Sequence, residues 1–249
     1  MRDVILAIET SNPTAPSSSG GGGAGSVCVG RISDGKSEIL ACEVLSAATR
    51  HDDALMPAVA AVCARAGIVP SGLARVAVSI GPGGFTSLRI AVTTAKMICE
   101  ATGAACIGVP TALALALAAR AHGTRGTLGV LLAWKREDVW RQRYDLSDDG
   151  VRAIDPNGTI VGLDTASAGC AVVVAEAALR DMLAVPAGVS VIEPRFDARW
   201  VLEASAGLTA VDPALLVPIY PREPEAVTKW RALHGAARSA RDAGGGSAE

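Results

Sequence analysis

The chain has 249 residues, half of them apolar and only 3% aromatic, and a formal net charge of −2. It is long enough for one large domain or two ordinary ones, with a core of Ala, Val, Leu and Ile. The near-neutral charge argues against broad electrostatic binding of nucleic acid, which needs a basic face. No signal peptide and no apolar run of about 18 residues is visible, which predicts a cytoplasmic protein without membrane contact.

Six cysteines are scattered along the chain without a CxxC pair. This spacing favours neither a disulfide framework nor a zinc site, so we expect buried thiols in a reducing compartment. The cysteines are Cys28, Cys42, Cys63, Cys99, Cys106 and Cys170.

The first half of the chain is predicted to begin with a βββαβα unit. Apolar runs indicate strands over 4–9, 26–32 and 39–45, which form an antiparallel meander with a turn at Asp34-Gly35. Residues 12–25, rich in Gly, Ser and Pro, are interpreted as a flexible low-complexity insertion. The elements predicted to follow are helix 53–66, strand 76–80, helix 86–102, strand 105–109 and helix 111–121.

The second half of the chain is predicted to form another α/β unit. Its expected elements are strands over 128–133, 139–146, 171–175 and 189–192 and a helix over 197–206. We therefore predict an N-terminal lobe over 1–109, a C-terminal lobe over 110–234 and a disordered tail over 235–249.

A glycine turn at 81–84 joins strand 76–80 to the helix over 86–102. Its glycines allow backbone angles closed to other residues, and Pro82 fixes one dihedral angle. The turn opens onto a helix N-terminus, where free backbone N–H groups and the helix dipole favour anions. A purely structural role for the turn is the alternative. The residues of the candidate anion site are Gly83, Gly84, Thr86 and Arg89.

The helices over 53–66 and 86–102 each have a second, largely apolar face. The stripe of the later helix that should face the sheet consists of Leu88, Val92, Ala95, Cys99 and Thr102. The second faces hold small residues and methionines, which let another helix approach closely. Two interpretations stay open, because these faces either pack on each other inside one domain or dock a second protein. The candidate interface residues are Met56, Ala60, Ile90, Thr94 and Met97.

Several known site patterns are matched by the residue types of the chain, but the surrounding structure or the partner residues that each site needs are missing from the sequence. Residues 30–37 fit the phosphate-loop pattern GxxxxGK[ST] and residues 20–25 fit GxGxxG, but strands follow both where helices are needed. His51 has Leu55 at i+4 where a helical metal pair needs a second ligand, so solvated carboxylates at the helix start are favoured over a metal site. The chain has no GxSxG elbow and no Cys with a plausible His partner. We therefore assign no catalytic residue and no metal.

Four segments agree in order and spacing with one known family. They are ILAIETS at 5–11, the H-x3-L-x-P pattern at His51–Pro57, GPGGFTSLRIAVTTAK at 81–96 and IGVPTALALA at 107–116, with a fainter match at 218–230. These segments resemble the bacterial TsaB family, also called YeaZ. The resemblance covers most of residues 1–120 and is weaker beyond them.

The resemblance implies a two-lobed α/β fold of the actin-like ATPase type (sugar kinase/Hsp70, RNase H-like). It also implies a non-catalytic scaffold that binds and activates a TsaD-like enzyme, which places a threonylcarbamoyl group on the adenosine next to the anticodon of certain tRNAs. The two-faced helices would form this interface, and tRNA would be contacted only indirectly. A homodimer, a TsaE-like ATPase as a further partner, and ATP or ADP at the interface with the partner stay open; the chain has no cofactor of its own.

The sequence departs from the family pattern at several positions. Glu9 stands where the family usually has Asp, Ser87 replaces a glycine of the turn, and Ala133 replaces another Asp. The insertion at 12–25 lies next to the place where actin-like ATPases hold phosphates. Of the helical HxxxH metal motif of TsaD-type chains, only His51 remains.

Two rival hypotheses follow from the same residues. In the first, the chain is an active actin-like ATPase or phosphotransferase, with Glu9 holding Mg²⁺ and the turn amides cradling phosphates. In the second, it is a homodimer that serves a different client.

Overall fold

The chain consists of two compact units, Met1–Ile219 and Tyr220–Glu249. The computed structural model describes residues 4–12, 23–33, 36–46, 51–223, 227 and 229–231. In the second unit, Arg231 forms an ion pair with Glu223 at 2.6 Å. The predicted tail at 235–249 and the predicted turn at Asp34-Gly35 lie outside the described residues, and so does most of the predicted insertion.

The first sheet has the strand order β3-β2-β1-β4-β5. The β1–β2 and β2–β3 pairs are antiparallel, which confirms the predicted meander, whereas β1, β4 and β5 run parallel. Every residue of β1 is buried, as expected for a strand covered on both faces. The strands are β1 (Val4–Glu9), β2 (Gly23–Ser33), β3 (Lys36–Ser46), β4 (Leu73–Gly81) and β5 (Ala105–Pro110).

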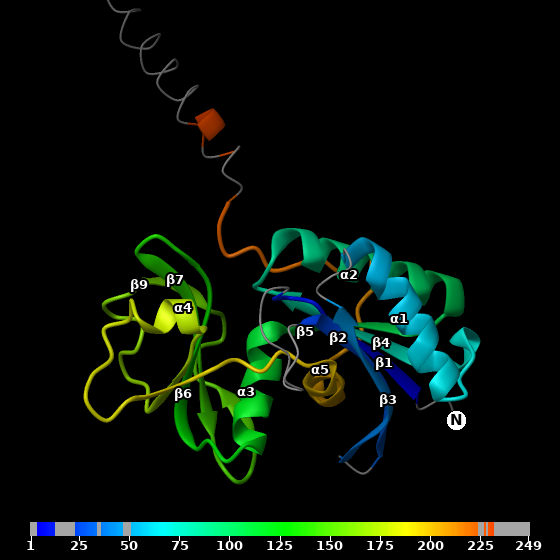
Figure 1. Ribbon diagram of the computed structural model, residues 1–249, viewed down its shortest axis with the longest axis horizontal. Coiled ribbons are helices and arrows are strands. Elements are labelled where there is room, and N and C mark those ends of the chain that lie inside the picture. The colour runs from blue at the N-terminus through cyan, green and yellow to red at the C-terminus, as the bar shows by residue number, and fades with distance from the viewer. Residues whose placement is uncertain are drawn as a thin grey trace, which may run out of the picture. The chain divides into compact units, whose positions relative to one another are not determined.

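Helices cover both faces of this sheet (Figure 1). On one face lie α1 (His51–Arg65) and α2 (Phe85–Thr102), packed on Leu6 and Ile8 of β1. On the other face α3 (Thr111–Ala121) and α5 (Ala198–Ala204) pack on Ile5 and Ala7. The alternation along β1 follows from the two-residue period of a strand, which sends successive side chains to opposite faces.

The second sheet has the order β11-β10-β6-β7-β8, with β9 paired to β7. The helix α3 packs Ala112, Ala116, Ala119 and Leu115 on this sheet and Ala114 on the first one. It is apolar all round, as a helix buried on several sides must be. The two shortest strands next to β7 were not predicted. The elements are β6 (Gly126–Lys135), β7 (Asp138–Leu146), β8 (Val151–Ala153), β9 (Thr159–Gly162), β10 (Val172–Val174), α4 (Ala177–Arg180) and β11 (Ser190–Ile192).

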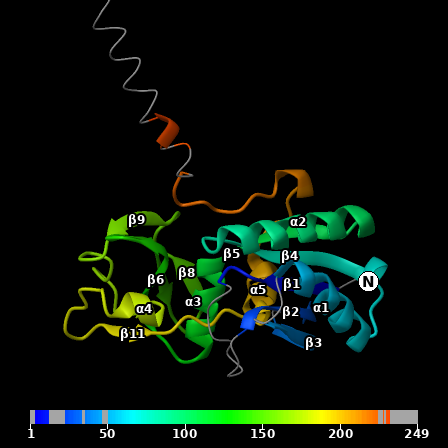
Figure 2. The same cartoon turned by 45° about the horizontal axis from the view of Figure 1, so that its top comes forward.

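After the second sheet the chain returns to the first one, as the yellow-to-orange ribbon in Figure 2 shows. The backbone N–H of Val211 donates to Cys106, and that of Ile219 donates to Ile80 at 2.7 Å. Although residues 110–234 were assigned to the C-terminal lobe, α5 and this returning segment thus pack on the N-terminal sheet. Three 3-10 helices complete the first unit: η1 (Pro70–Gly72), η2 (Ser205–Gly207) and η3 (Pro213–Leu215).

One cysteine pair contradicts the expectation of six thiols. Cys28 on β2 and Cys42 on β3 stand directly opposite each other and form a disulfide, with 4.2 Å between their Cα atoms. The other four cysteines are buried free thiols, as predicted. The spacing of 14 residues carries no recognised motif, and only the register of the two strands brings the sulfur atoms together.

The phosphate-loop pattern at 30–37 falls on the strands β2 and β3, as expected from the strand residues that follow it. Among the elements that the structure describes, the strand β2 is followed by β3 and not by the helix that a phosphate loop needs. Among the helices that the structure describes, none is long and apolar enough to cross a membrane.

Candidate functional site

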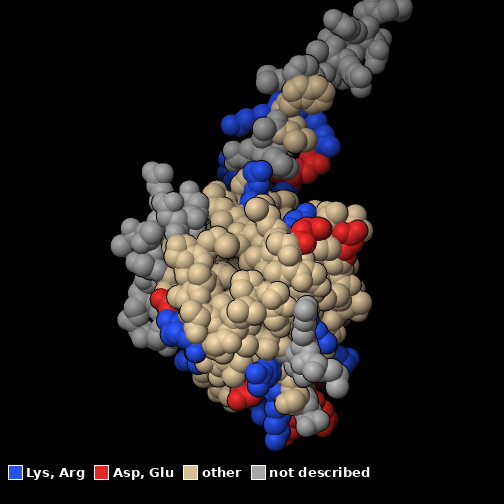
Figure 3. Space-filling view, turned by 90° about the vertical axis from the view of Figure 1, so that its right-hand side faces the viewer, with Lys and Arg blue, Asp and Glu red and all other residues tan. Residues whose placement is uncertain are grey.

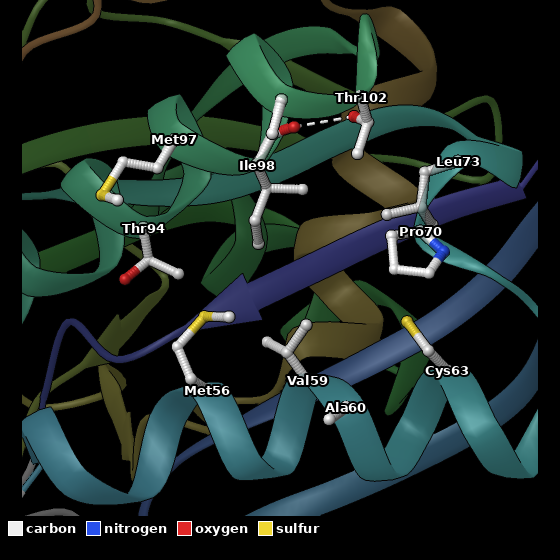
Figure 4. A pocket seen from close by; sticks show the side chains of 11 residues that line it. Met56, Val59, Ala60, Cys63, Pro70, Leu73, Thr94, Met97, Ile98 and Thr102 are labelled. Carbon is white, nitrogen blue, oxygen red and sulfur yellow. Dashed lines mark hydrogen bonds between the residues drawn. The ribbon is translucent and has the colours of Figure 1, made fainter.

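An apolar groove of about 410 Å³ lies between α1 and α2. Figure 4 shows its two walls, with Met97, Thr94 and Ile98 on α2 facing Met56 and Val59 on α1. Pro70 of η1 and Leu73 of β4 close one end. The remaining lining residues are Ala60, Cys63, Ala101 and Thr102. The groove is therefore built almost entirely from aliphatic and sulfur-containing side chains.

The helix α2 presents one buried and one open face. Leu88, Val92, Ala95 and Cys99 are buried, as the predicted stripe required, whereas Thr102, assigned to the same stripe, is only half-buried and lines the groove. On the open face the side chain of Met97 is 67% exposed, and Met56 on α1 is 51% exposed. Figure 3 shows this side of the molecule as a broad field without charged residues, which lie toward its edges. Contiguous exposed apolar surface of this kind marks an interaction site more often than a random feature.

Four of the five predicted interface residues line the groove together: Met56, Ala60, Thr94 and Met97. Ile90 does not line it, because this side chain is half-buried and packs against the core. Helical periodicity missed Pro70, Leu73 and Cys63. The first two lie outside the helices, and Cys63 is buried on the inner side of α1.

The glycine turn before α2 is anchored to the end of β1. The backbone N–H of Gly84 donates to the carbonyl oxygen of Ser11 at 2.6 Å. At Gly83 a Cβ would collide with that same carbonyl group. Thr10 adds a hydrogen bond from its hydroxyl to the carbonyl of Ser87 at 3.2 Å. The turn therefore has a structural role, which needs glycine because two backbones approach closely.

Only two of the four residues of the candidate anion site lie together in the structure. Gly83 and Gly84 line a cleft between the two sheets, whereas Thr86 and Arg89 do not. The guanidinium of Arg89 instead lies 5.1 Å from the ring centroid of Phe85. The structure thus leaves the positive charge of the predicted cradle outside the cleft.

The cleft between the two sheets measures about 320 Å³. Its wall on the second sheet includes a β-bulge, where the β6–β7 register shifts between Leu132 and Lys135. Within the bulge Ala133 has a φ of 51°, an unusual angle for a residue with a side chain. Bulges of this kind redirect side chains next to binding sites. The cleft is lined by Ser11, Asn12, Pro82, Gly83, Gly84, Leu132, Ala133, Trp134, Glu176 and Phe196.

Glu9, at the end of β1, faces the protein interior and is 1% exposed. Its carboxylate accepts hydrogen bonds from the backbone N–H of Ser11 at 2.6 Å and from the Ser11 hydroxyl. Burial raises the pKa of Glu9, the bonds from Ser11 and Ser79 oppose this shift, and Asp197 adds to it. Glu9 is therefore a buried structural carboxylate and does not line the cleft.

ATP with Mg²⁺, the ligand that the fold type implies, does not fit the residues of this cleft. Phosphates need convergent N–H donors and cations, but no Lys or Arg belongs to the described lining, and Glu176 adds a carboxylate. The Gly84 N–H already donates to the carbonyl oxygen of Ser11, and the Glu9 carboxylate faces the protein interior and not the cleft. Within the described parts of the chain, no group of three or more His, Cys, Asp or Glu side chains could hold a metal ion.

These features define the class of protein, a two-lobed α/β protein of the actin-like ATPase type, as predicted. A family model described as "TsaD: tRNA N6-adenosine threonylcarbamoyltransferase" matches residues 43–157. Proteins described as uncharacterized, from two Mycobacterium tuberculosis strains and from Mycobacterium bovis, are 30% identical over 228 residues, or 89% of this chain and 93% of theirs. The chain belongs to the family of these mycobacterial proteins.

Two solved structures from Pseudomonas aeruginosa share the fold. One is described as an uncharacterized protein similar to the peptidase YeaZ, with a TM-score of 0.70, 18% identity and coverage of 88% of this chain and 100% of that one. The other, YeaZ, has a TM-score of 0.66, 18% identity and coverage of 88% and 99%. The resemblance to the TsaB (YeaZ) family found in the sequence is thereby confirmed, and the fold is that of YeaZ.

Proposed function

We propose that the chain is a cytoplasmic, non-catalytic scaffold subunit that binds and activates a TsaD-like enzyme. The complex would form N6-threonylcarbamoyladenosine in tRNA. The observation that carries this proposal is the open apolar groove between α1 and α2, which no described residue of the first unit fills. The TsaD family match and the YeaZ fold support the choice of partner.

The groove has the chemistry of a helix-docking surface. Exposed methionines such as Met56 and Met97 adapt to the shape of a partner, and Ala60 and Ala101 leave room for close approach. A stable interface buries roughly 1,600 Å² in total, with most of the binding energy in a few central apolar contacts. A second copy of the chain would use the same surface, so the homodimer and the complex with the enzyme would compete.

The partner would supply the remaining chemistry. Because this chain has a net charge of −2, tRNA would be held mainly by the enzyme. ATP or ADP at the shared interface would depend on cations of the partner, since the described cleft lining has none. A TsaE-like ATPase is proposed as a further component of the same complex.

Co-purification of the full chain with the TsaD-like enzyme of the same organism tests the proposal. Met97→Asp should abolish association, because it places a charge in the apolar groove, yet leave the fold intact, because the side chain is 67% exposed. Met182→Asp is the matched control, since Met182 is also exposed but lies in the second lobe, after α4. Association retained by Met97→Asp would contradict the proposed interface.

The rival ATPase hypothesis has its own measurement. The purified chain should show no ATP turnover and no thermal shift with ATP and Mg²⁺, because neither Glu9 nor a basic residue is among the described residues that line the cleft. Turnover by the chain alone, unchanged after Met97→Asp, would favour an active phosphotransferase over the scaffold.

A further inference from the structure

The cleft between the two sheets has a polar end and an aromatic side. Asn12, after β1, and Glu176, before α4, meet there through a hydrogen bond of 2.6 Å from Nδ2 of Asn12 to Oε1 of Glu176. Trp134 and Phe196 also line the cleft. The lining therefore offers a carboxylate and aromatic rings to the same ligand.

The carboxylate of Glu176 has no cationic partner in the described structure. Its hydrogen bond comes from a neutral amide, and none of the ion pairs among the described residues involves it. Residues 13–22, which follow Asn12, contain neither Lys nor Arg in their sequence. Burial raises the pKa of Glu176, and the bond from Asn12 opposes the shift. A carboxylate withdrawn from water without a cation costs free energy that a positively charged ligand would recover.

Glu176 keeps acceptor capacity for such a ligand. A carboxylate can accept about four hydrogen bonds, and Asn12 takes one site on Oε1. An ammonium group donates three hydrogen bonds and accepts none, so it matches this remaining capacity. A phosphate or carboxylate would instead repel Glu176.

One aromatic residue of the cleft, Trp134, directly follows the bulge residue Ala133 in β6. The left-handed backbone of Ala133 interrupts the β6–β7 register immediately before Trp134, whose side chain remains 38% exposed. Phe196 precedes α5 and is almost fully buried. Aromatic faces attract cations and also pack against apolar groups.

We propose that this cleft binds a small organic molecule with a protonated amine on an apolar or aromatic body. The amine donates to Glu176, and the body packs against Trp134 and Phe196. A ligand in this position contacts both lobes of the first unit, because Asn12 follows the first sheet and Trp134 belongs to the second. The inference does not depend on the proposed scaffold function, since the groove and the cleft share no lining residue.

Three probes of one shape test the charge preference on the full chain: benzylamine, benzyl alcohol and benzoate. Ligand-observed NMR titration should show saturable binding of benzylamine, weaker binding of benzyl alcohol and none of benzoate. Glu176→Gln should weaken benzylamine binding about tenfold or more, because it removes a charge-assisted hydrogen bond. Glu193→Gln is the control, since Glu193 is an exposed glutamate paired with Arg180.

Trp134→Leu is the second variant and removes only an aromatic ring that is partly exposed. This variant should also weaken the binding of benzylamine. Circular dichroism and the melting temperature verify that each variant is folded. No saturable benzylamine binding, equal or tighter binding of benzoate, or unchanged affinity in both Glu176→Gln and Trp134→Leu would overturn the proposal. None of these results bears on co-purification with the TsaD-like enzyme, so the two proposals fail separately.

Discussion

Gly84 donates its backbone N–H to Ser11 at 2.6 Å, which joins the turn before α2 to the end of β1. The bond connects two segments more than 70 residues apart in the sequence. Both residues also line the cleft. The position of α2, and with it one wall of the apolar groove, therefore depends on how closely these two backbones approach.

Gly83→Ala is predicted to destabilise the protein by about 1–3 kcal/mol. A Cβ at this position would collide with the Ser11 carbonyl group, which is backbone and cannot turn away. Urea unfolding followed by circular dichroism measures the loss. Gly207→Ala is the control, because a Cβ there meets nothing within 4 Å. Equal stability of both variants would show that the contact with Ser11 relaxes at no cost.

Glu9→Gln is predicted to flatten the dependence of stability on pH. Burial raises the pKa of Glu9 above 4.5, so its contribution is fully present below the pKa of the unfolded chain. That contribution is lost as the pH rises from there through the higher pKa of the folded state. Wild type should therefore lose stability relative to Glu9→Gln over this range, as measured by denaturant unfolding. If the difference in unfolding free energy between wild type and Glu9→Gln stayed constant with pH, this would contradict a buried, titrating Glu9.

Asp155→Asn is predicted to cost about 1–2 kcal/mol at neutral pH. Asp155 accepts hydrogen bonds from the backbone N–H and the guanidinium of Arg143, and these hold the pKa of Asp155 below its usual value.

The contribution of Asp155 to stability depends on pH with the opposite sign to the contribution of Glu9. The stabilisation by Asp155 is present above the unfolded pKa of about 3.9 and is lost as the pH falls through the folded value. Thermal melts from pH 7 to pH 2 should show wild type and Asp155→Asn converging in acid. Asp145→Asn, at a more exposed ion pair with Arg152, should have a smaller effect. A gap that persists at low pH would rule out the ion pair as its cause.

Chain purified and unfolded without reductant is predicted to present four reactive thiols, and six after reduction. The disulfide between Cys28 and Cys42 accounts for the difference, because the other four cysteines are free. Replacing both residues by Ser should cost about 3 kcal/mol, the value expected for a short closed loop. A thiol count with Ellman's reagent and a melting curve measure both effects. Six thiols before reduction would exclude the disulfide.

Local patterns predicted the elements well where neighbouring residues determine them. The continuous apolar run at 4–9 identified β1, and the buried stripe from Leu88 to Cys99 identified the inner face of α2. Gly103 ends α2 with a φ of 71°, as a helix followed by glycine suggests. The short strands β8 and β9 were not predicted, whereas the comparably short β10 and β11 were found within the predicted strands over 171–175 and 189–192.

Residues of the groove were predicted only where their spacing along a single helix was enough to place them on its open face. Met56 and Met97 were found from their helical faces, whereas Ile90, on the same predicted face as Met97, packs on the core instead. Arg89 was expected at the anion site but lies over Phe85. In both cases the direction of a side chain depends on its neighbours in space, which spacing along the chain does not reveal.

The sequence by itself determined the order of strands and α-helices from β1 to α3, the apolar faces of α1 and α2, and the glycine turn, because hydrophobic pattern and backbone freedom are local properties. Only the tertiary structure decided that Cys28 meets Cys42, that Glu9 is buried and that Asn12 and Glu176 meet in one cleft. These relationships join residues from different elements, so they depend on strand register and on the path of the chain between the two sheets.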